Sequence, residues 1–324
     1  ATPARLVLGG DGFNGLIERP HLVAADSTLL MELDFAADMA ADAIADRADP
    51  SRRARLVNRP TRAVPGAAWS GKTLEWPRAP QDYGAIHFHE DDIDDARWPP
   101  AWRFDVPAEF APGCYAARLT AGDARYHIPF FVRDRGKPRR VALLMPTMTY
   151  AAYANLRVRL AGAWNEMIHG RLTVLDQTDL LLLDIPALGS STYDLNADGG
   201  HVVYSSMDRP VTNFRPDGRI YKFCQDLLLV HWLRKRGIDW QPVSDDELHD
   251  EGTGALAGVE VLITSSHPEY MTGEVRAAID ALFDIGRPAC GLNRSFARLE
   301  DPCNAGTDHF ADTENRYYST AFNS

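Results

Sequence analysis

The segment VEVLITSSHPEYMTGEVRAAIDALF, residues 259–283, holds the pattern that decides the fold class. Its apolar run over 259–263 is typical of a fully buried strand. The polar stretch SSHPEY follows at 265–270, and an amphipathic helix pattern extends from Gly273 to Asp284. A buried strand that ends in a histidine, a carboxylate and a phenol just before a helix delivers these groups to a crevice rather than to a core.

The same alternation of strand and helix predicts an α/β domain with a mostly parallel sheet over residues 139–324. RVALLMPT (140–147) and DWQPVSD (239–245) are expected to be buried strands. Between them, 220–237 predicts a helix that ends at Gly237 and buries an apolar stripe of Phe223, Leu227, Leu228, Val230, His231 and Leu233. We expect this domain to be incomplete at its C-terminus.

The N-terminal part of the sequence predicts β structure in three portions. Residues 1–30 are expected to be the tail of a β-sandwich whose earlier strands precede this chain. Residues 31–98 predict a connecting arm and then a long loop rich in Pro, Trp and Asp. Residues 99–135 predict a small β domain with strands in WRFDVP, GCYAARLT and YHIPFFVR.

Composition narrows the class of protein. The 324-residue chain is 45% hydrophobic, which permits a sizeable core, and its net charge of −11 argues against nucleic acid as a partner. No apolar run approaches the roughly 18 residues of a membrane span, and the N-terminus lacks a signal-peptide pattern. Four scattered cysteines without a CxxC pair are typical of a reducing compartment. We therefore expect a cytoplasmic globular protein without membrane contact.

Tyrosines accompany the ends of the predicted strands. PTMTYAAYAN places Tyr150 and Tyr153 after the first strand, and a long excursion before the next strand carries Tyr193. Together with Glu269 they offer hard oxygen donors, and phenolate suits a trivalent ion such as iron. His267 is a candidate ligand or base. The alternative, which the pattern alone favours, is that the tyrosines are core aromatics with hydrogen-bonded hydroxyls.

Other interpretations stay open on the residues alone. A metal-free hydrolase would use Ser265, Ser266 or Cys290 as its nucleophile, although the flanking glycines of a nucleophile elbow are missing. A non-catalytic carbohydrate-binding or assembly module is compatible with the β-sandwich segments.

GAIHFHEDD places His87 and His89 on one face of a strand, where metal ligands at i and i+2 would lie. No second cluster with zinc spacing accompanies them, so a structural hydrogen-bonding role is the preferred interpretation.

The order of the motifs resembles that of a known family. FNGLIERP, YGAIHFHEDD, GCYAARL, IPFFVR, PTMTYAAYAN, YDLNADGGHVVYSS, RPVTNFRP, DLLLVHWLRKRGID and SSHPEYMT occur in the order found in the large, catalytic subunit of N,N-dimethylformamidase. They extend from Gly12 to about Asp284. After Phe283 the sequence departs from the family, because the longer glycine-rich strand and the aromatic segment expected there are missing. A catalytic acid from that part is therefore not placed.

The resemblance implies a lectin-like β-sandwich, a small β domain and an α/β catalytic domain similar to the glutamine amidotransferase fold. It also implies a mononuclear Fe(III) site held by two tyrosines and one glutamate. The glutamate matches Glu269, one tyrosine matches Tyr193, and the other matches Tyr153, with Tyr150 as its alternative. His267 and Asn293 match the nearby polar residues of the site.

The activity implied by the resemblance is hydrolysis of a small N-alkylated formamide, such as N,N-dimethylformamide, to formate and an alkylamine. The iron would polarise the formyl oxygen and activate a water molecule, and His267 would accept or return a proton. The implied partners are a small accessory subunit and further copies of the assembly.

Overall fold

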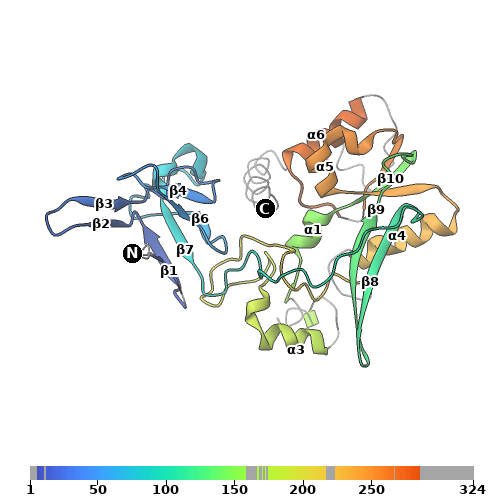
Figure 1. Ribbon diagram of the computed structural model, residues 1–324, viewed down its shortest axis with the longest axis horizontal. Helices are drawn as coiled ribbons and strands as arrows, with labels where there is room; N and C mark the ends of the chain where they lie inside the picture. The colour runs from blue at the N-terminus through green and yellow to red at the C-terminus, as the bar shows by residue number, and fades with distance from the viewer. Residues whose placement is uncertain are drawn as a thin grey trace.

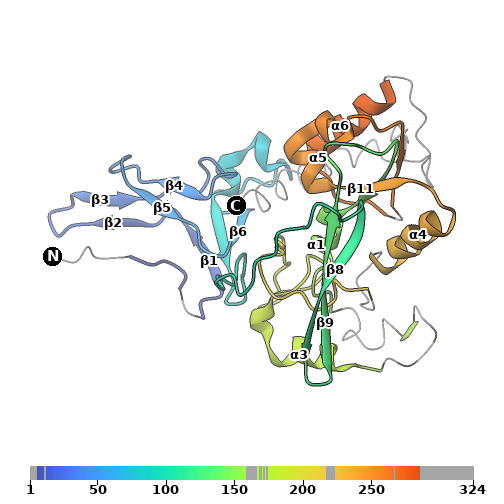
Figure 2. The same cartoon turned by 45° about the vertical axis from the view of Figure 1, so that its right-hand side comes forward.

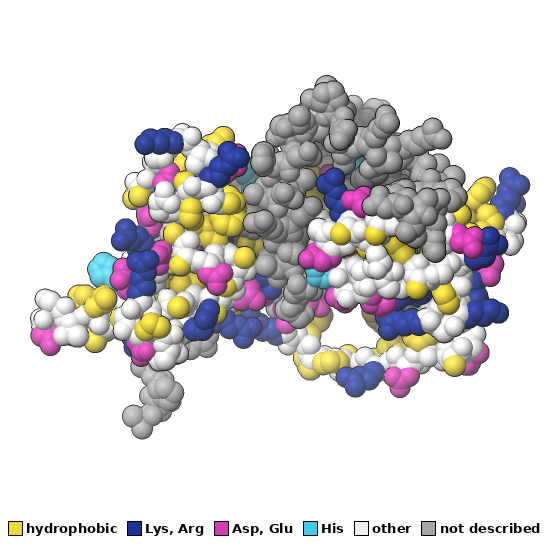
Figure 3. All heavy atoms as spheres, turned by 90° about the horizontal axis from the view of Figure 1, so that it is seen from above, with side chains coloured by type: hydrophobic (Ala, Val, Ile, Leu, Met, Phe, Trp, Pro, Cys, Tyr) yellow, Lys and Arg dark blue, Asp and Glu magenta, His cyan; other side chains and the backbone are white. Residues whose placement is uncertain are grey.

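The structure of the protein, a computed structural model, describes residues 6–10, 12–157, 166–167, 170, 172, 174–216, 223–265 and 267–284. Figure 1 shows a β-rich part and an α/β part joined by extended segments. On the face drawn in Figure 3, acidic and basic side chains are interspersed over the described surface. Within the described residues, no helix combines the length and the apolar character needed to cross a lipid bilayer.

Seven short strands build the β-rich part. In chain order they are β1 (Gly15–Glu18), β2 (His21–Val23), β3 (Leu29–Glu32), β4 (Ala43–Ala45), β5 (Arg53–Arg55), β6 (Thr61–Val64) and β7 (Ala85–Phe88). Strands β1, β7 and β6 form an antiparallel sheet in that order, while β2–β3 and β4–β5 form two ribbons. The 3-10 helices η1 (Trp76–Arg78) and η2 (Pro80–Tyr83) precede β7.

The core of this part is formed by Leu33, Phe35, Ile44 and Ile86. Its pairing differs from the expected division into a sandwich tail at 1–30 and an arm with a loop at 31–98, because β1 from the first segment pairs with β7 from the second. Strands of three or four residues are too short to show a clear alternation, and their partners lie far along the chain.

A long antiparallel hairpin follows, made of β8 (Gly113–Ala121) and β9 (Ala124–Val132). Gly122 has a φ of +58° and lies in the two-residue turn, where a residue without Cβ adopts this conformation at low cost. The strands expected in GCYAARLT and YHIPFFVR are confirmed. The strand expected in WRFDVP is wrong: Trp102 instead stacks on Phe104 with a ring separation of 5.4 Å in an irregular segment.

The α/β part confirms the expected parallel strands. Strand β10 (Val141–Met145) lies between β11 (Trp240–Ser244) and β12 (Val261–Ile263) and is parallel to both. The accompanying helices are α1 (Thr147–Ala152), α3 (Gln177–Asp184), α4 (Phe223–Lys235), α5 (Asp245–Glu251) and α6 (Gly273–Asp284), with 3-10 helices η4 (Pro186–Leu188) and η5 (Gly252–Leu256). The closer likeness to the amidotransferase fold stays a prediction.

Strand β10 divides its side chains between two cores. Ala142 and Leu144 pack into a core with residues of α5 and α6, while Leu143 and Met145 pack into a second core with residues of α4. This is the period of two that a strand covered on both faces requires. The hairpin contributes Cys114 and Phe131 to the second core, and Figure 2 shows it lying alongside this part.

Helix α4 confirms part of the expected apolar stripe, because Phe223, Val230 and Leu233 are buried. Leu228, assigned to that stripe, is 70% exposed, and His231 is also exposed. The buried face instead includes Asp226, which is 1% exposed. A buried carboxylate is stable only with a hydrogen-bond partner, and Asp226 accepts one from the Tyr150 hydroxyl, so this polar residue takes a place that hydrophobicity does not predict.

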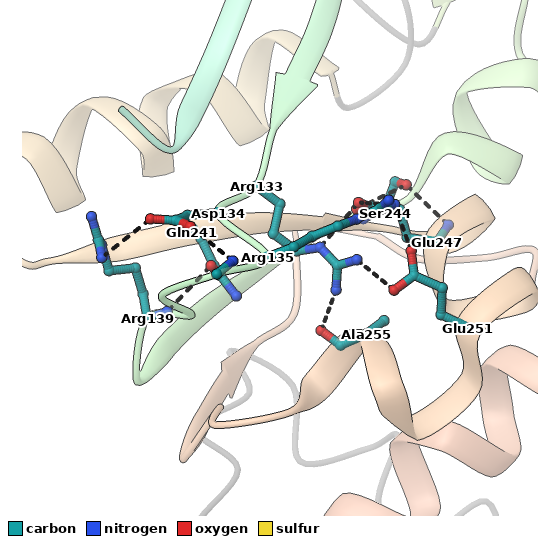
Figure 4. A network of polar contacts seen from close by, with 10 residues as sticks. Arg133, Asp134, Arg135, Arg139, Gln241, Ser244, Glu247, Glu251 and Ala255 are labelled. Carbon is teal, nitrogen blue, oxygen red and sulfur yellow. Dashed lines mark hydrogen bonds and ion pairs between the residues drawn. The ribbon is translucent and has the colours of Figure 1, made fainter. Parts of the chain in front are cut away.

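A polar network ties the end of the hairpin to the α/β part (Figure 4). Arg133, just after β9, forms ion pairs with Glu247 at 3.1 Å and with Glu251 at 2.6 Å. It also donates to the Ala255 carbonyl oxygen at 2.7 Å. Glu247 additionally accepts from the Ser244 backbone in the capping box of α5, so one carboxylate serves both the helix start and the domain contact.

Candidate metal centre

Three oxygen-bearing side chains converge where β10 and β12 end. The Tyr153 hydroxyl donates to Glu269 Oε2 at 2.6 Å, and the Tyr193 hydroxyl donates to Glu269 Oε1 at 2.8 Å. The two phenol rings stack with centroids 4.3 Å apart and an interplanar angle of 19°. Tyr153 and Tyr193, which are 40 positions apart, thus share the carboxylate of Glu269, which is 116 positions from Tyr153. Each of the two Glu269 oxygens accepts one phenol hydrogen bond.

Glu269 is held by its backbone. Thr149 in α1 accepts hydrogen bonds at Oγ1 from the amides of Glu269 and Tyr270, at 3.0 and 3.1 Å. Thr149 is fully buried, so these bonds are shielded from water and fix the segment after β12 against α1.

His267 lies at the rim of the cluster. Its Nε2 is 3.1 Å from Glu269 Oε2, and its side chain is 39% exposed. Tyr270 lies on the other side, where its hydroxyl contacts that of Tyr193. The cluster therefore combines three oxygen donors with one imidazole that reaches solvent.

The loop that carries Tyr193 is anchored by two buried polar residues. Asn155 donates to the carbonyl oxygens of Leu188 and Pro210 at 3.0 and 2.9 Å, and accepts from the Thr212 amide at 2.9 Å. Arg209 donates to the Ser190 carbonyl oxygen at 2.8 Å. These bonds satisfy backbone groups of the segment 188–212, most of which is irregular, so they hold Tyr193 against Tyr153.

Tyr150 does not belong to the cluster. Its ring is fully buried between Phe214 and Phe223, with centroid separations of 5.4 and 5.2 Å. Its hydroxyl donates to Asp226 in α4. Of the two tyrosines that the sequence left open, the structure brings Tyr153 to Glu269 and leaves Tyr150 in the core.

Burial and the shared carboxylate keep the phenols protonated in the absence of a cation. Burial first, and then the hydrogen bond to Glu269, raises the pKa of Tyr153 above its ordinary value. Burial and the neighbouring hydroxyls raise the pKa of Tyr193 as well. A bound cation reverses this balance because it favours the phenolate, as metal ions do for coordinating acids.

The donor set fits a hard, highly charged ion. Two phenol oxygens and one carboxylate bring three negative charges when deprotonated, which matches the charge of Fe(III). The oxygens already lie within hydrogen-bonding distance of one another, so their side chains converge without rearrangement of the backbone. Tyr153, Tyr193 and Glu269 are therefore the residues that could hold such an ion.

The remaining predicted site residues are distributed as follows. Ser265 is 3% exposed, and its hydroxyl makes no hydrogen bond to a described residue, so none of the described side chains contacts it as a base. Ser266, Cys290 and Asn293 lie outside the described residues. His87 lies in β7 and His89 directly follows its end, and neither is hydrogen-bonded to Tyr153, Tyr193 or Glu269 among the described contacts.

The sequence did not single out Thr149 or Asn155 as parts of the site, and Tyr270 received no role. Thr149 and Asn155 act through backbone contacts, for which a single sequence carries no residue pattern. The feature that Thr149, Asn155 and Tyr270 share in the sequence is their position, since each follows the end of a buried strand.

A family model and two known proteins that match this chain carry the name of the same enzyme. A family model described as N,N-dimethylformamidase beta subunit-like, C-terminal, matches residues 61–291. The N,N-dimethylformamidase beta subunit of Paracoccus aminophilus is 33% identical over 306 residues, covering 85% of this chain and 40% of that protein. The protein of the same name from an Alcaligenes species is 34% identical over 255 residues, covering 76% of this chain and 34% of that protein. The chain thus spans well under half the length of these relatives.

Proposed function

Because the chain belongs to the family of N,N-dimethylformamidase beta subunit-like proteins, we propose that it forms the metal-binding catalytic part of an amidohydrolase. Its substrates would be small N-alkylated formamides such as N,N-dimethylformamide, and its products formate and an alkylamine. The predicted family is confirmed, and the relatives' names specify a beta subunit. That this is the large, catalytic subunit is part of the proposal.

The observation that carries the proposal is the convergence of the Tyr153 and Tyr193 hydroxyls on Glu269. Bound at these oxygens, Fe(III) would supply Lewis acidity toward the amide oxygen and toward water. The three side chains would neutralise the charge of the ion, and Thr149 would keep Glu269 in place through its backbone.

His267 is proposed as the proton carrier. Hydrolysis of a formamide requires removal of a proton from the attacking water and delivery of a proton to the departing amine nitrogen. His267 lies beside Glu269 and is partly exposed, so it reaches the cluster from the solvent side, where water and substrate arrive. The contact with Glu269 orients its imidazole.

The test is metal analysis and a visible absorption spectrum on the purified protein, followed by a formate-release assay. We expect one iron per chain and a broad phenolate-to-iron charge-transfer band. Glu269→Gln should lose both, while Tyr115→Phe, a change in the hairpin, should keep both. A colourless protein that does not take up ferric ion would contradict the metal-dependent mechanism. Metal and colour are scored separately from turnover, because the chain covers only 40% and 34% of the length of the two relatives.

We also propose that the chain assembles with another subunit, since the relatives are named as beta subunits. The β2–β3 ribbon projects from the β-rich part and exposes Leu22, Val23, Leu29 and Leu30 (Figures 1 and 2). Exposed apolar side chains on such a ribbon are typical of a surface that a partner covers. Light scattering of the purified chain should show a monomer, with or without the Leu22→Lys change, if a different subunit covers this ribbon. Self-association that Leu22→Lys abolishes would instead assign the ribbon to contacts between copies of this chain.

A further inference from the structure

Two histidines and an aspartate meet outside the tyrosine–glutamate cluster. His87 belongs to β7, His89 follows it, and Asp198 comes from the loop that also carries Tyr193. His87 Nε2 is 2.9 Å from Asp198 Oδ2, and His89 Nε2 is 3.9 Å from Asp198 Oδ1. One potential ligand atom from each of the three residues lies within 4.8 Å of the other two.

The hydrogen bonding of His89 leaves one nitrogen for a ligand. Asp92 accepts from the His89 amide at 3.0 Å, and its other oxygen lies 3.1 Å from His89 Nδ1. A carboxylate only accepts hydrogen bonds, so Nδ1 carries a proton, and in the neutral imidazole the lone pair is then on Nε2, where a metal ion would compete with a second proton. A carboxylate that orients a histidine in this way is a recurrent feature of metal sites.

The Nε2 atom of His89 is buried and makes no hydrogen bond to any residue that the structure describes. The residue as a whole is 6% exposed. A buried imidazole nitrogen without a donor is costly, because it has lost its hydrogen bonds to water without replacement. This nitrogen faces the Asp198 carboxylate, which is where a shared ion would lie.

Glycine at position 200 permits the close approach of the loop. A Cβ at this position would lie 2.6 Å from His89 Nε2 and 3.2 Å from His87 Cε1. The Gly200 amide also donates to Asp198 Oδ1 at 2.8 Å, which orients the carboxylate. The backbone of the loop is therefore shaped around the two imidazoles.

We propose that His87, His89 and Asp198 bind a divalent transition-metal ion, with zinc as the best match. Imidazole nitrogen with one carboxylate oxygen suits borderline divalent ions, whereas the phenol and carboxylate oxygens of the other cluster suit a hard trivalent ion. In a tetrahedral zinc site, bonds of 2.0–2.1 Å separate the ligand atoms by about 3.3 Å. The distances of 2.9 and 3.9 Å reach the two different oxygens of Asp198, and one ligand atom from each residue lies within 4.8 Å of the other two, which is close enough for one ion after small side-chain shifts.

The ion would connect the β-rich part to the loop that carries Tyr193. Asp198 follows Tyr193 by five positions, and the Ala197 amide donates to Asp91 at 2.9 Å beside the same histidines. The site is reachable, since the side chains of His87 and Asp198 are 26% and 19% exposed. Its role is to fix this loop in position, and water completes the coordination.

The test is zinc titration by calorimetry in the Glu269→Gln background, which removes a ligand of the tyrosine cluster. We expect one zinc per chain with a Kd below about 1 µM. His87→Ala and Asp198→Asn should each weaken binding by at least 100-fold, and Asp92→Asn, which removes only the orienting carboxylate, by about 10- to 100-fold. His21→Ala on exposed β2 and Asp123→Asn in the hairpin turn are the matched controls and should bind normally.

A second readout uses the wild-type chain and does not depend on the variants folding. Zinc should slow amide hydrogen exchange in residues 195–201, and Co(II) at the same site should show the visible bands of tetrahedral coordination. Failure of the chain to bind zinc, or binding that His87→Ala and Asp198→Asn leave unchanged, would overturn the proposal. The calorimetry is independent of the tyrosine cluster, because the Glu269→Gln background removes a ligand of that cluster. In the wild-type chain, loss of the Co(II) bands on His87→Ala assigns them to the histidine site.

Discussion

Tyr150 and Tyr153 lie three residues apart at α1, and each donates a hydrogen bond to a carboxylate, Asp226 and Glu269 respectively. The first pair is sealed, with exposures of 0% for Tyr150 and 1% for Asp226. The second opens to solvent, since the Glu269 side chain is 32% exposed. A second phenol, that of Tyr193, reaches the free oxygen of Glu269.

The difference shows how the same pair of groups serves different purposes. A sealed phenol–carboxylate pair stabilises the core because both groups are satisfied and neither meets an ion. An open pair with a second phenol offers three convergent oxygens that can exchange their protons for a cation. Residue type alone therefore does not separate the two, whereas burial and the number of donors do.

The largest expected contrast between the two tyrosines is in iron binding. Tyr153→Phe should weaken Fe(III) binding by more than 100-fold, because it removes one of three ligand oxygens, whereas Tyr150→Phe should leave the stoichiometry at one. Metal analysis after equilibration with ferric citrate measures both. Loss of iron from Tyr150→Phe in a folded protein would place the wrong tyrosine at the site.

Stability should show the opposite order. Tyr150→Phe leaves the buried Asp226 without the phenol's hydrogen bond, so the free energy of unfolding should fall by about 1–3 kcal/mol. Tyr153→Phe in the metal-free chain should change it by less, because water can replace the phenol beside the partly exposed Glu269. Urea unfolding of the two variants provides the comparison, and equal losses would contradict it.

Thr149 sharpens the comparison from the carboxylate side. Thr149→Val removes the oxygen that accepts from the amides of Glu269 and Tyr270, so Glu269 should lose its fixed position and the Kd for iron should rise about tenfold. Thr149→Ser retains the oxygen and is the matched control. A normal Kd in Thr149→Val would show that the bonds at Thr149 do not position the ligand.

The smallest effect is a difference in alkaline stability. Burial and Asp226 raise the pKa of Tyr150 well above its usual value, so Tyr150 stabilises the fold below the unfolded pKa of about 10 and this contribution is lost as pH rises above it. Tyr150→Phe removes this dependence. Between pH 10 and 11 its free energy of unfolding should fall less steeply than that of the wild type, by at most about 1.4 kcal/mol per pH unit. Parallel curves from chemical unfolding would contradict the assignment.

The sequence predicted the α/β part better than the β-rich part for a physical reason. Residues 141–145 and 261–263 form short apolar runs followed by helices, and such runs are local signals. The pairing of β1 with β7 depends instead on contacts between distant short strands, which leave no local pattern. The apolar stripe predicted for α4 left out the buried Asp226, because its hydrogen-bond partner Tyr150 lies on another element.

In the candidate site too, residues with a local sequence signal were predicted, whereas residues that act through distant contacts were not. Glu269, Tyr153, Tyr193 and His267 were all named from their place after strands and in the excursion between them, and the structure brings them together. The family resemblance favoured Tyr153 and kept Tyr150 as its alternative; in the structure Tyr150 donates to Asp226 in α4, whereas Tyr153 donates to Glu269. Thr149 and Asn155 support the site through hydrogen bonds to backbone groups, and residue type alone does not predict such bonds.

The residues of the tyrosine–glutamate cluster are widely separated along the chain: Glu269 is 116 positions from Tyr153 and 76 from Tyr193. Closing such loops costs chain entropy before the contacts they form can repay it, which slows the folding steps that depend on them. The cluster is therefore complete only when strands β10 and β12 are paired and the excursion is docked. In a refolding experiment, the colour of bound iron would follow the last of these events, well after helix formation and collapse.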